Sequence, residues 1–163
     1  RIVADGELDD LFAAFLAFYG DNIAVGSHAY PGLEAALDRL AKDGAKLAVC
    51  TNKHEAGARK LLAELALLPR FQALAGRDTF EVCKPHPEHL TRTIARAGGD
   101  PRRSVMVGDS AVDIKTARAA GIPVIGTTFG YTDQPIATFA PDAIISHYDD
   151  LDRALALSLA QRR

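Results

Sequence analysis

Short apolar runs alternate with longer stretches of helical spacing, and this alternation most limits the folds open to the chain. Strand-like runs fall at residues 46–50, 71–76, 104–107, 123–126 and 142–145, and helices are predicted at residues 31–42, 55–67, 87–97, 111–120 and 151–159. Apolar strands separated by helices of about 10–15 residues are typical of βαβ units. Because such units cross over in a right-handed way, the pattern predicts an α/β fold, a three-layer α/β/α sandwich around a parallel sheet.

The start of the chain departs from this alternation. Apolar residues recur with helical spacing over residues 7–19, but no strand follows that stretch. We therefore expect residues 1–26 to belong to a separate helical subdomain, and residues 27–163 to form the core domain.

Composition and charge exclude several classes of function. A net charge of −2 with 25% charged residues gives no basic surface for nucleic acid. No uncharged stretch is long and apolar enough to span a bilayer, so no membrane partner is expected. The two cysteines, Cys50 and Cys83, do not suggest a disulfide framework, and they favour a reducing cytoplasm.

Small polar residues follow the first predicted strand. Thr51, Asn52 and Lys53 stand where this strand gives way to a helix. A hydroxyl together with the backbone N–H groups of a helix start can cradle a phosphate. The alternative is an ordinary helix cap, because Thr and Asn are common there.

A lysine follows the second strand-like run. Lys84 precedes Pro85 and Pro87, so it is expected on a stiff loop that can aim its ammonium. A positioned lysine beside a transferring phosphoryl group neutralises charge in the transition state. A solvated loop lysine is the alternative.

Two carboxylates follow the third predicted strand. Residues 108–113 read Gly-Asp-Ser-Ala-Val-Asp, which places Asp109 and Asp113 on one face of a first helical turn. Mg²⁺ uses one or two carboxylates together with water and substrate phosphate. The alternative makes Asp109 a helix cap and Asp113 an exposed helix residue.

Together these residues resemble the haloacid dehalogenase superfamily of phosphatases. Thr51 matches the second motif of that superfamily, Lys84 the third, and residues 108–113 the Mg²⁺-binding fourth motif. Residues 51–53, 108–110, 129–131 and 141–145 are similar to the phosphoglycolate phosphatase family.

The resemblance implies a small phosphorylated substrate, hydrolysed through an aspartyl-phosphate with Mg²⁺ as cofactor. The substrate that it implies is 2-phosphoglycolate, which yields glycolate and phosphate. Thr51 and Lys84 would be catalytic, and Thr51, Asn52 and Lys84 would bind the phosphoryl group. Asp109 would hold the metal, and Asp113 and Ser110 would support the site.

The first motif of the superfamily is not found in the chain. It carries the attacking aspartate just after the first strand. No apolar strand of adequate length precedes residues 5–8, and residues 8–11 lie inside a helical pattern. We expect the chain to begin inside the helical cap, with about 60–70 residues and the central strand of the sheet absent. The expected result is a polypeptide with open sheet edges and no activity of its own.

Three other readings stay open at this point. A phosphatase of the same superfamily could act on pyrophosphate, a sugar phosphate or a nucleotide. A non-catalytic fragment that binds phosphate or Mg²⁺ agrees with the missing nucleophile. A receiver-type signalling domain is the third alternative, but it would need an acidic pair at its start.

His86 and His89 could be taken for metal ligands. They lack partners with zinc-site spacing, and are interpreted as loop and helix-start residues.

Overall fold

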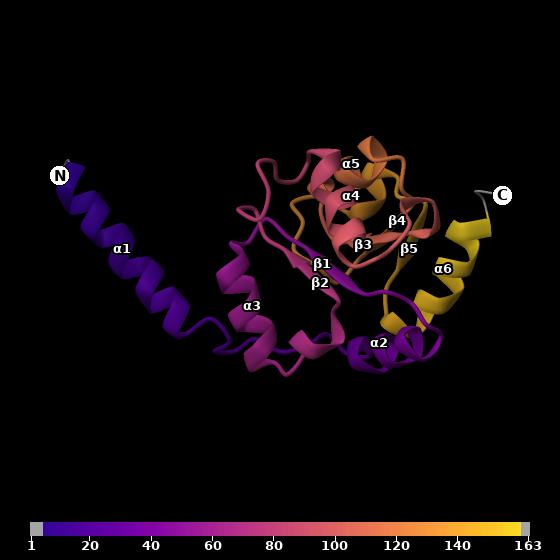
Figure 1. Ribbon diagram of the computed structural model, residues 1–163, viewed down its shortest axis with the longest axis horizontal. Coiled ribbons are helices and arrows are strands. Elements are labelled where there is room, and N and C mark those ends of the chain that lie inside the picture. Colours follow the sequence, from indigo (N-terminus) through magenta and orange to yellow (C-terminus); the bar gives the residue numbers. More distant parts are fainter. Residues whose placement is uncertain (1–4, 161–163) are drawn as a thin grey trace.

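The computed structural model describes residues 5–160 as helices and short strands in alternation (Figure 1). The elements run α1 (Asp5–Asp21), α2 (Leu33–Lys42), β1 (Ala48–Cys50), α3 (Glu55–Glu64), β2 (Ala73–Ala75), α4 (Pro87–Arg96), β3 (Met106–Gly108), α5 (Ala111–Ala119), β4 (Val124–Thr127), β5 (Ala143–Ile145) and α6 (Leu151–Ala160). Four short 3₁₀ helices lie between them, at Leu68–Arg70, Pro101–Arg103, Ile136–Phe139 and Tyr148–Asp150. Each strand and helix predicted from the sequence is present, with ends shifted by a few residues.

All paired strands run parallel, as predicted, but they form two sheets. β1 pairs with β2 in the first sheet, in register Val49 to Leu74. β3, β4 and β5 form the second sheet in that order, with Val107 opposite Ile125. Within residues 5–160, β1 and β3 pair with one strand each, so each leaves one edge unpaired. A single continuous sheet is therefore not present in the described part of the chain.

Helices cover both faces of the larger sheet. Val124 on β4 belongs to a buried cluster with Leu90 of α4 and Ile114 of α5. The next residue, Ile125, belongs to a second cluster with Ala36 of α2 and Leu151 of α6. Neighbouring strand residues point to opposite faces, so the two clusters lie on the two sides of the sheet. This arrangement agrees with the predicted layering of helices around parallel strands.

Helix α1 extends away from the rest of the molecule (Figure 1). Its large apolar side chains are mostly exposed, namely Leu8, Leu11, Phe12, Phe15 and Phe18. It meets the core near its end, where the Lys60 ammonium donates to the Gly20 carbonyl over 2.6 Å. Within residues 5–160, no helix combines the length and the apolar character needed to cross a membrane.

Candidate active site

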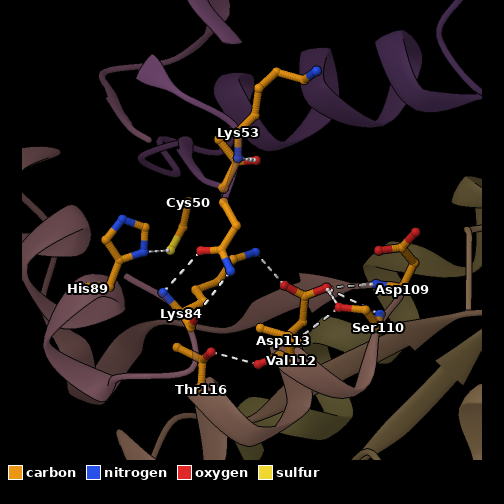
Figure 2. Close-up of polar contacts among 11 residues, drawn as sticks. Cys50, Lys53, Lys84, His89, Asp109, Ser110, Val112, Asp113 and Thr116 are labelled. Atoms are coloured by element: carbon orange, nitrogen blue, oxygen red, sulfur yellow. Dashed lines mark hydrogen bonds and ion pairs between the residues drawn. The ribbon is translucent and has the colours of Figure 1, made fainter. Parts of the chain in front are cut away.

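A buried ion pair joins the loop after β2 to the start of α5. The Lys84 ammonium lies 2.6 Å from Asp113 Oδ1, and the two side chains are only 10% and 6% exposed. Figure 2 shows Lys84 and Asp113 pointing toward each other from different segments of the chain. Since β2 and β3 belong to different sheets, this contact links the carboxyl ends of both sheets.

The second oxygen of Asp113 organises the start of α5. Asp113 Oδ2 accepts hydrogen bonds from Ser110 Oγ at 2.7 Å and from the backbone N–H groups of Asp109 and Ser110 at 3.2 Å. Ser110 Oγ in turn accepts from the Asp113 N–H, which completes a capping box. The alternative that made Asp109 the helix cap and Asp113 an exposed residue is therefore wrong: Ser110 is the cap, and Asp113 is buried.

The Asp109 carboxylate is held by residues 129–131, which the pattern of strands and helices did not indicate. Asp109 Oδ2 accepts a hydrogen bond from the Tyr131 N–H at 2.8 Å. Gly130 lies so close that a Cβ built there would stand 2.0 Å from Asp109 Cβ. A larger residue at position 130 would displace the carboxylate, because real Cβ contacts are never so short. The only sequence signal was the Phe129-Gly130-Tyr131 run of the family resemblance.

The loop after β1 brings Thr51 and Asn52 to the same strand ends. The Thr51 N–H donates to the Ala75 carbonyl at 2.9 Å, and Thr51 Oγ1 accepts from the Lys53 N–H at 3.1 Å. Asn52 is hydrogen-bonded through its side chain to the backbone of Lys84. Among residues 5–160, no hydrogen bond joins the Thr51 side chain to Lys84 or Asp109.

Most of the predicted site residues thus form one connected network. Asn52 contacts Lys84, Lys84 contacts Asp113, and Asp113 contacts both Ser110 and Asp109. Thr51 joins this network through its place in the chain beside Asn52. The residues follow three strands, β1, β2 and β3, and the side-chain contacts among them bring the carboxyl ends of the two sheets together.

A thiol–imidazole contact lies beside Lys84 of the network (Figure 2). Cys50 Sγ is 3.3 Å from His89 Nδ1, and His89 Nε2 is 2.9 Å from the Gly76 carbonyl. A carbonyl only accepts, so Nε2 donates to it and Nδ1 accepts from the thiol. Burial is the main cause that raises the pKa of Cys50 and lowers the pKa of His89. Both groups are therefore neutral near pH 7, so Cys50 does not suit a nucleophile. Both ring nitrogens of His89 already have hydrogen-bond partners, which leaves neither of them free for a metal.

The two histidines lie close to where they were expected. His86 precedes α4, and its Nδ1 accepts from the Glu88 N–H at 3.3 Å. His89 lies in the first turn of α4, and its side chain is fully buried. Their interpretation as loop and helix-start residues agrees with this geometry.

The donor set fits Mg²⁺ at one carboxylate. Both oxygens of Asp113 are used by Lys84 and by the start of α5. Asp109 uses Oδ2 for the Tyr131 N–H, and Oδ1 has no hydrogen-bond partner among residues 5–160. Within that range no group of three or more His, Cys, Asp or Glu side chains forms a ready metal cage. Mg²⁺ is commonly held by one or two carboxylates with waters and phosphate, and the free oxygen of Asp109 suits that mode.

Residues 3–121 match the family model of haloacid dehalogenase-like hydrolases, the class that this fold and this cluster of side chains indicate. The chain is 51% identical over 156 residues to the phosphoglycolate phosphatase of Mesorhizobium japonicum, covering 96% of the chain and 67% of that relative. It is 43% identical over 158 residues to the phosphoglycolate phosphatase of Agrobacterium fabrum, covering 97% of the chain and 68% of that relative.

A solved structure agrees with the sequence relatives. The crystal structure of a predicted phosphoglycolate phosphatase from Haemophilus somnus superposes with a TM-score of 0.88 at 30% identity, over 94% of this chain and 68% of that one. The chain therefore belongs to the haloacid dehalogenase-like hydrolases, and within them to the phosphoglycolate phosphatase family. It spans about two thirds of the length of these relatives.

Proposed function

We propose that this protein is a Mg²⁺-dependent phosphatase whose substrate is 2-phosphoglycolate, released as glycolate and phosphate. The observation that carries the proposal is the network from Asn52 through Lys84 and Asp113 to Asp109. It holds one ammonium and one free carboxylate oxygen at a common edge of the fold. The two relatives at 51% and 43% identity are both phosphoglycolate phosphatases, which supports the choice of substrate.

Each residue has a proposed role at the phosphoryl group. The Thr51 hydroxyl and the Asn52 N–H bind phosphoryl oxygens, and that N–H donates to no acceptor among residues 5–160. The Lys84 ammonium neutralises charge that builds up on the phosphoryl oxygens in the transition state. Asp113 and Ser110 orient Lys84 and Asp109. Asp109 would hold Mg²⁺, which supplies positive charge to the phosphate when bound.

The attacking carboxylate is proposed to come from outside the described strands. Of the five strands in residues 5–160, only β3 is followed directly by a carboxylate, and we assign that residue, Asp109, to the metal. The unpaired edges of β1 and β3 support a further strand between them that delivers the nucleophile. We therefore propose that residues 1–163 alone are inactive.

We also propose a division into two domains and a cellular location for the protein. The exposed apolar side chains of α1 support a helical cap that includes residues 1–26, beside a core at residues 27–163. Both cysteines are free thiols, which supports a reducing cytoplasm.

Phosphate release from a substrate panel tests the proposal. The protein encoded with whatever in-frame sequence precedes the Arg1 codon is compared with residues 1–163, both in Mg²⁺. The panel holds 2-phosphoglycolate, pyrophosphate, a sugar phosphate and a nucleotide. We expect 2-phosphoglycolate to have the highest kcat/KM with the longer protein, and no turnover by residues 1–163.

A tenfold preference for another substrate would overturn the proposed substrate. Turnover by residues 1–163 would overturn the proposal that the nucleophile comes from outside the described strands. Phosphate binding without turnover by either protein would favour a non-catalytic phosphate- and Mg²⁺-binding protein.

A further inference from the structure

One side-chain amide holds both backbone polar groups of Lys84. Asn52 Oδ1 accepts from the Lys84 N–H at 3.1 Å, and Asn52 Nδ2 donates to the Lys84 carbonyl at 2.9 Å. The two residues are 32 positions apart in the sequence, one after β1 and the other after β2. This contact spans the first sheet at its carboxyl end, beside the ion pair between Lys84 and Asp113.

We propose that Asn52 is a positioning residue whose side chain fixes the backbone of Lys84, so that the ammonium is held at the phosphate-binding site. The inference rests on the proposed function, because the phosphate at this site is part of that proposal. Asn52 then has two roles: its backbone N–H binds the phosphate as proposed above, whereas its side chain acts only through Lys84.

The chemistry of Lys84 explains why its backbone needs this contact. The ammonium of a lysine sits on a flexible four-carbon chain. Its position is therefore well defined only if both the backbone and the ammonium are held in place. Asp113 holds the tip at 2.6 Å. Asn52 holds the base, since it satisfies the N–H and the carbonyl of the same residue. With both ends held, the charge is aimed before the substrate arrives, as electrostatic stabilisation of a transition state requires.

The amide group is the side chain that meets both demands. Lys84 offers one donor and one acceptor, and an amide supplies the complementary acceptor and donor in one plane. Asn52→Asp keeps the acceptor for the Lys84 N–H but places an oxygen against the Lys84 carbonyl. Asn52→Ala removes both contacts. The two variants therefore separate the two hydrogen bonds.

A double-mutant cycle tests whether Asn52 acts through Lys84. Calorimetry measures the Kd of inorganic phosphate in Mg²⁺ for the chain, for Asn52→Ala, for Lys84→Met and for both together. We expect Asn52→Ala to weaken binding about tenfold when Lys84 is present, the factor for losing one or two neutral hydrogen bonds. In the Lys84→Met background the same change should have no further effect. An equal loss in both backgrounds would overturn the inference, because Asn52 would then contact phosphate by itself.

Amide hydrogen exchange gives a readout that does not depend on phosphate. We expect the Lys84 N–H to exchange about tenfold faster in Asn52→Ala and to stay protected in Asn52→Asp, with Val49 unchanged in both. Faster exchange at Val49 and Lys84 alike would mean a general loss of stability, and would overturn the positioning role. Asn22→Ala is the matched control, because it removes another amide-to-backbone bond, from Asn22 Nδ2 to the Phe18 carbonyl.

The two measurements keep the two proposals apart. If the unmodified chain binds no phosphate, the proposed phosphate site fails, while exchange at Lys84 still decides whether Asn52 holds the loop. If phosphate binds and the cycle is additive, the site stands and the role of Asn52 falls.

Discussion

Lys84 and Asp113 form an ion pair 2.6 Å long with 10% and 6% of their side chains exposed, and it joins the strand ends of two separate sheets. Burial gives this pair its importance, because a buried charge that loses its partner is poorly solvated. Asp113 also completes the capping box of α5 with Ser110 and accepts a hydrogen bond from the Asp109 N–H.

Asp113→Ala should destabilise the fold by about 3 kcal/mol, because it leaves the Lys84 charge buried and removes the capping box of α5. Urea denaturation followed by circular dichroism measures the change. Asp152→Ala is the control, since its pair with Arg39 is 48% and 39% exposed. Exposed pairs contribute about 0–1 kcal/mol. Equal losses in the two variants would contradict a special role for the buried pair.

Lys84→Met should lower the kcat of the active protein by about 10²–10³, the cost of removing a positioned group that stabilises transition-state charge. Steady-state phosphate release from 2-phosphoglycolate measures the effect. Lys42→Met removes an exposed lysine at the end of α2 and should leave kcat unchanged. A normal kcat in Lys84→Met would remove this residue from the site.

Gly130→Ala should weaken Mg²⁺ binding about tenfold or more, as observed when groups that orient metal ligands are disturbed. The added methyl group would stand 2.0 Å from Asp109 Cβ, so the carboxylate must move. Mg²⁺ titration by calorimetry measures the change. Gly20→Ala is the control, because a Cβ there meets nothing within 4 Å. Unchanged affinity in Gly130→Ala would show that Asp109 does not hold the metal.

The stability of the protein should fall as pH drops below about 6.5, the ordinary pKa of histidine. His89 is buried and its pKa is lowered, so the folded state resists the proton that the unfolded state takes up. The contribution of His89 to the free energy of unfolding is therefore complete above about pH 6.5 and is lost as the pH falls further. Urea midpoints from pH 5 to 8 measure the effect.

His89→Gln should flatten this pH dependence, whereas His28→Gln, an exposed histidine, should not change it. The same slope in His89→Gln as in the unmodified chain would mean that other groups cause the loss of stability at low pH.

The sequence located the helices and strands, and it brought out most residues of the candidate site, because these features are local or follow from strand direction. Apolar runs located β1 and β3, and the polar residues directly after them, Thr51 and Asp109, were therefore expected at the carboxyl ends of parallel strands. Helical spacing placed Asp113 on the same helix face as Asp109. It could not reveal the ion pair between Asp113 and Lys84, because these residues are 29 positions apart.

Long-range contacts account for what the sequence did not reveal. The hydrogen bonds from Asn52 to Lys84, and from the Tyr131 N–H to Asp109, join loops that are far apart in the chain. The choice of Ser110 over Asp109 as helix cap depends on backbone angles that neither residue type fixes. The division into two sheets depends on which strand edges meet, and periodicity does not report this.

Paramagnetic NMR with Mn²⁺ in place of Mg²⁺ tests most directly whether Thr51, Lys84 and Asp109 share one phosphate and one metal ion. With inorganic phosphate present, the amide signals of all three residues should broaden together as Mn²⁺ is added, while those of α6 stay sharp. Broadening at Asp109 that leaves Thr51 and Lys84 sharp, or broadening centred elsewhere, would contradict a common site.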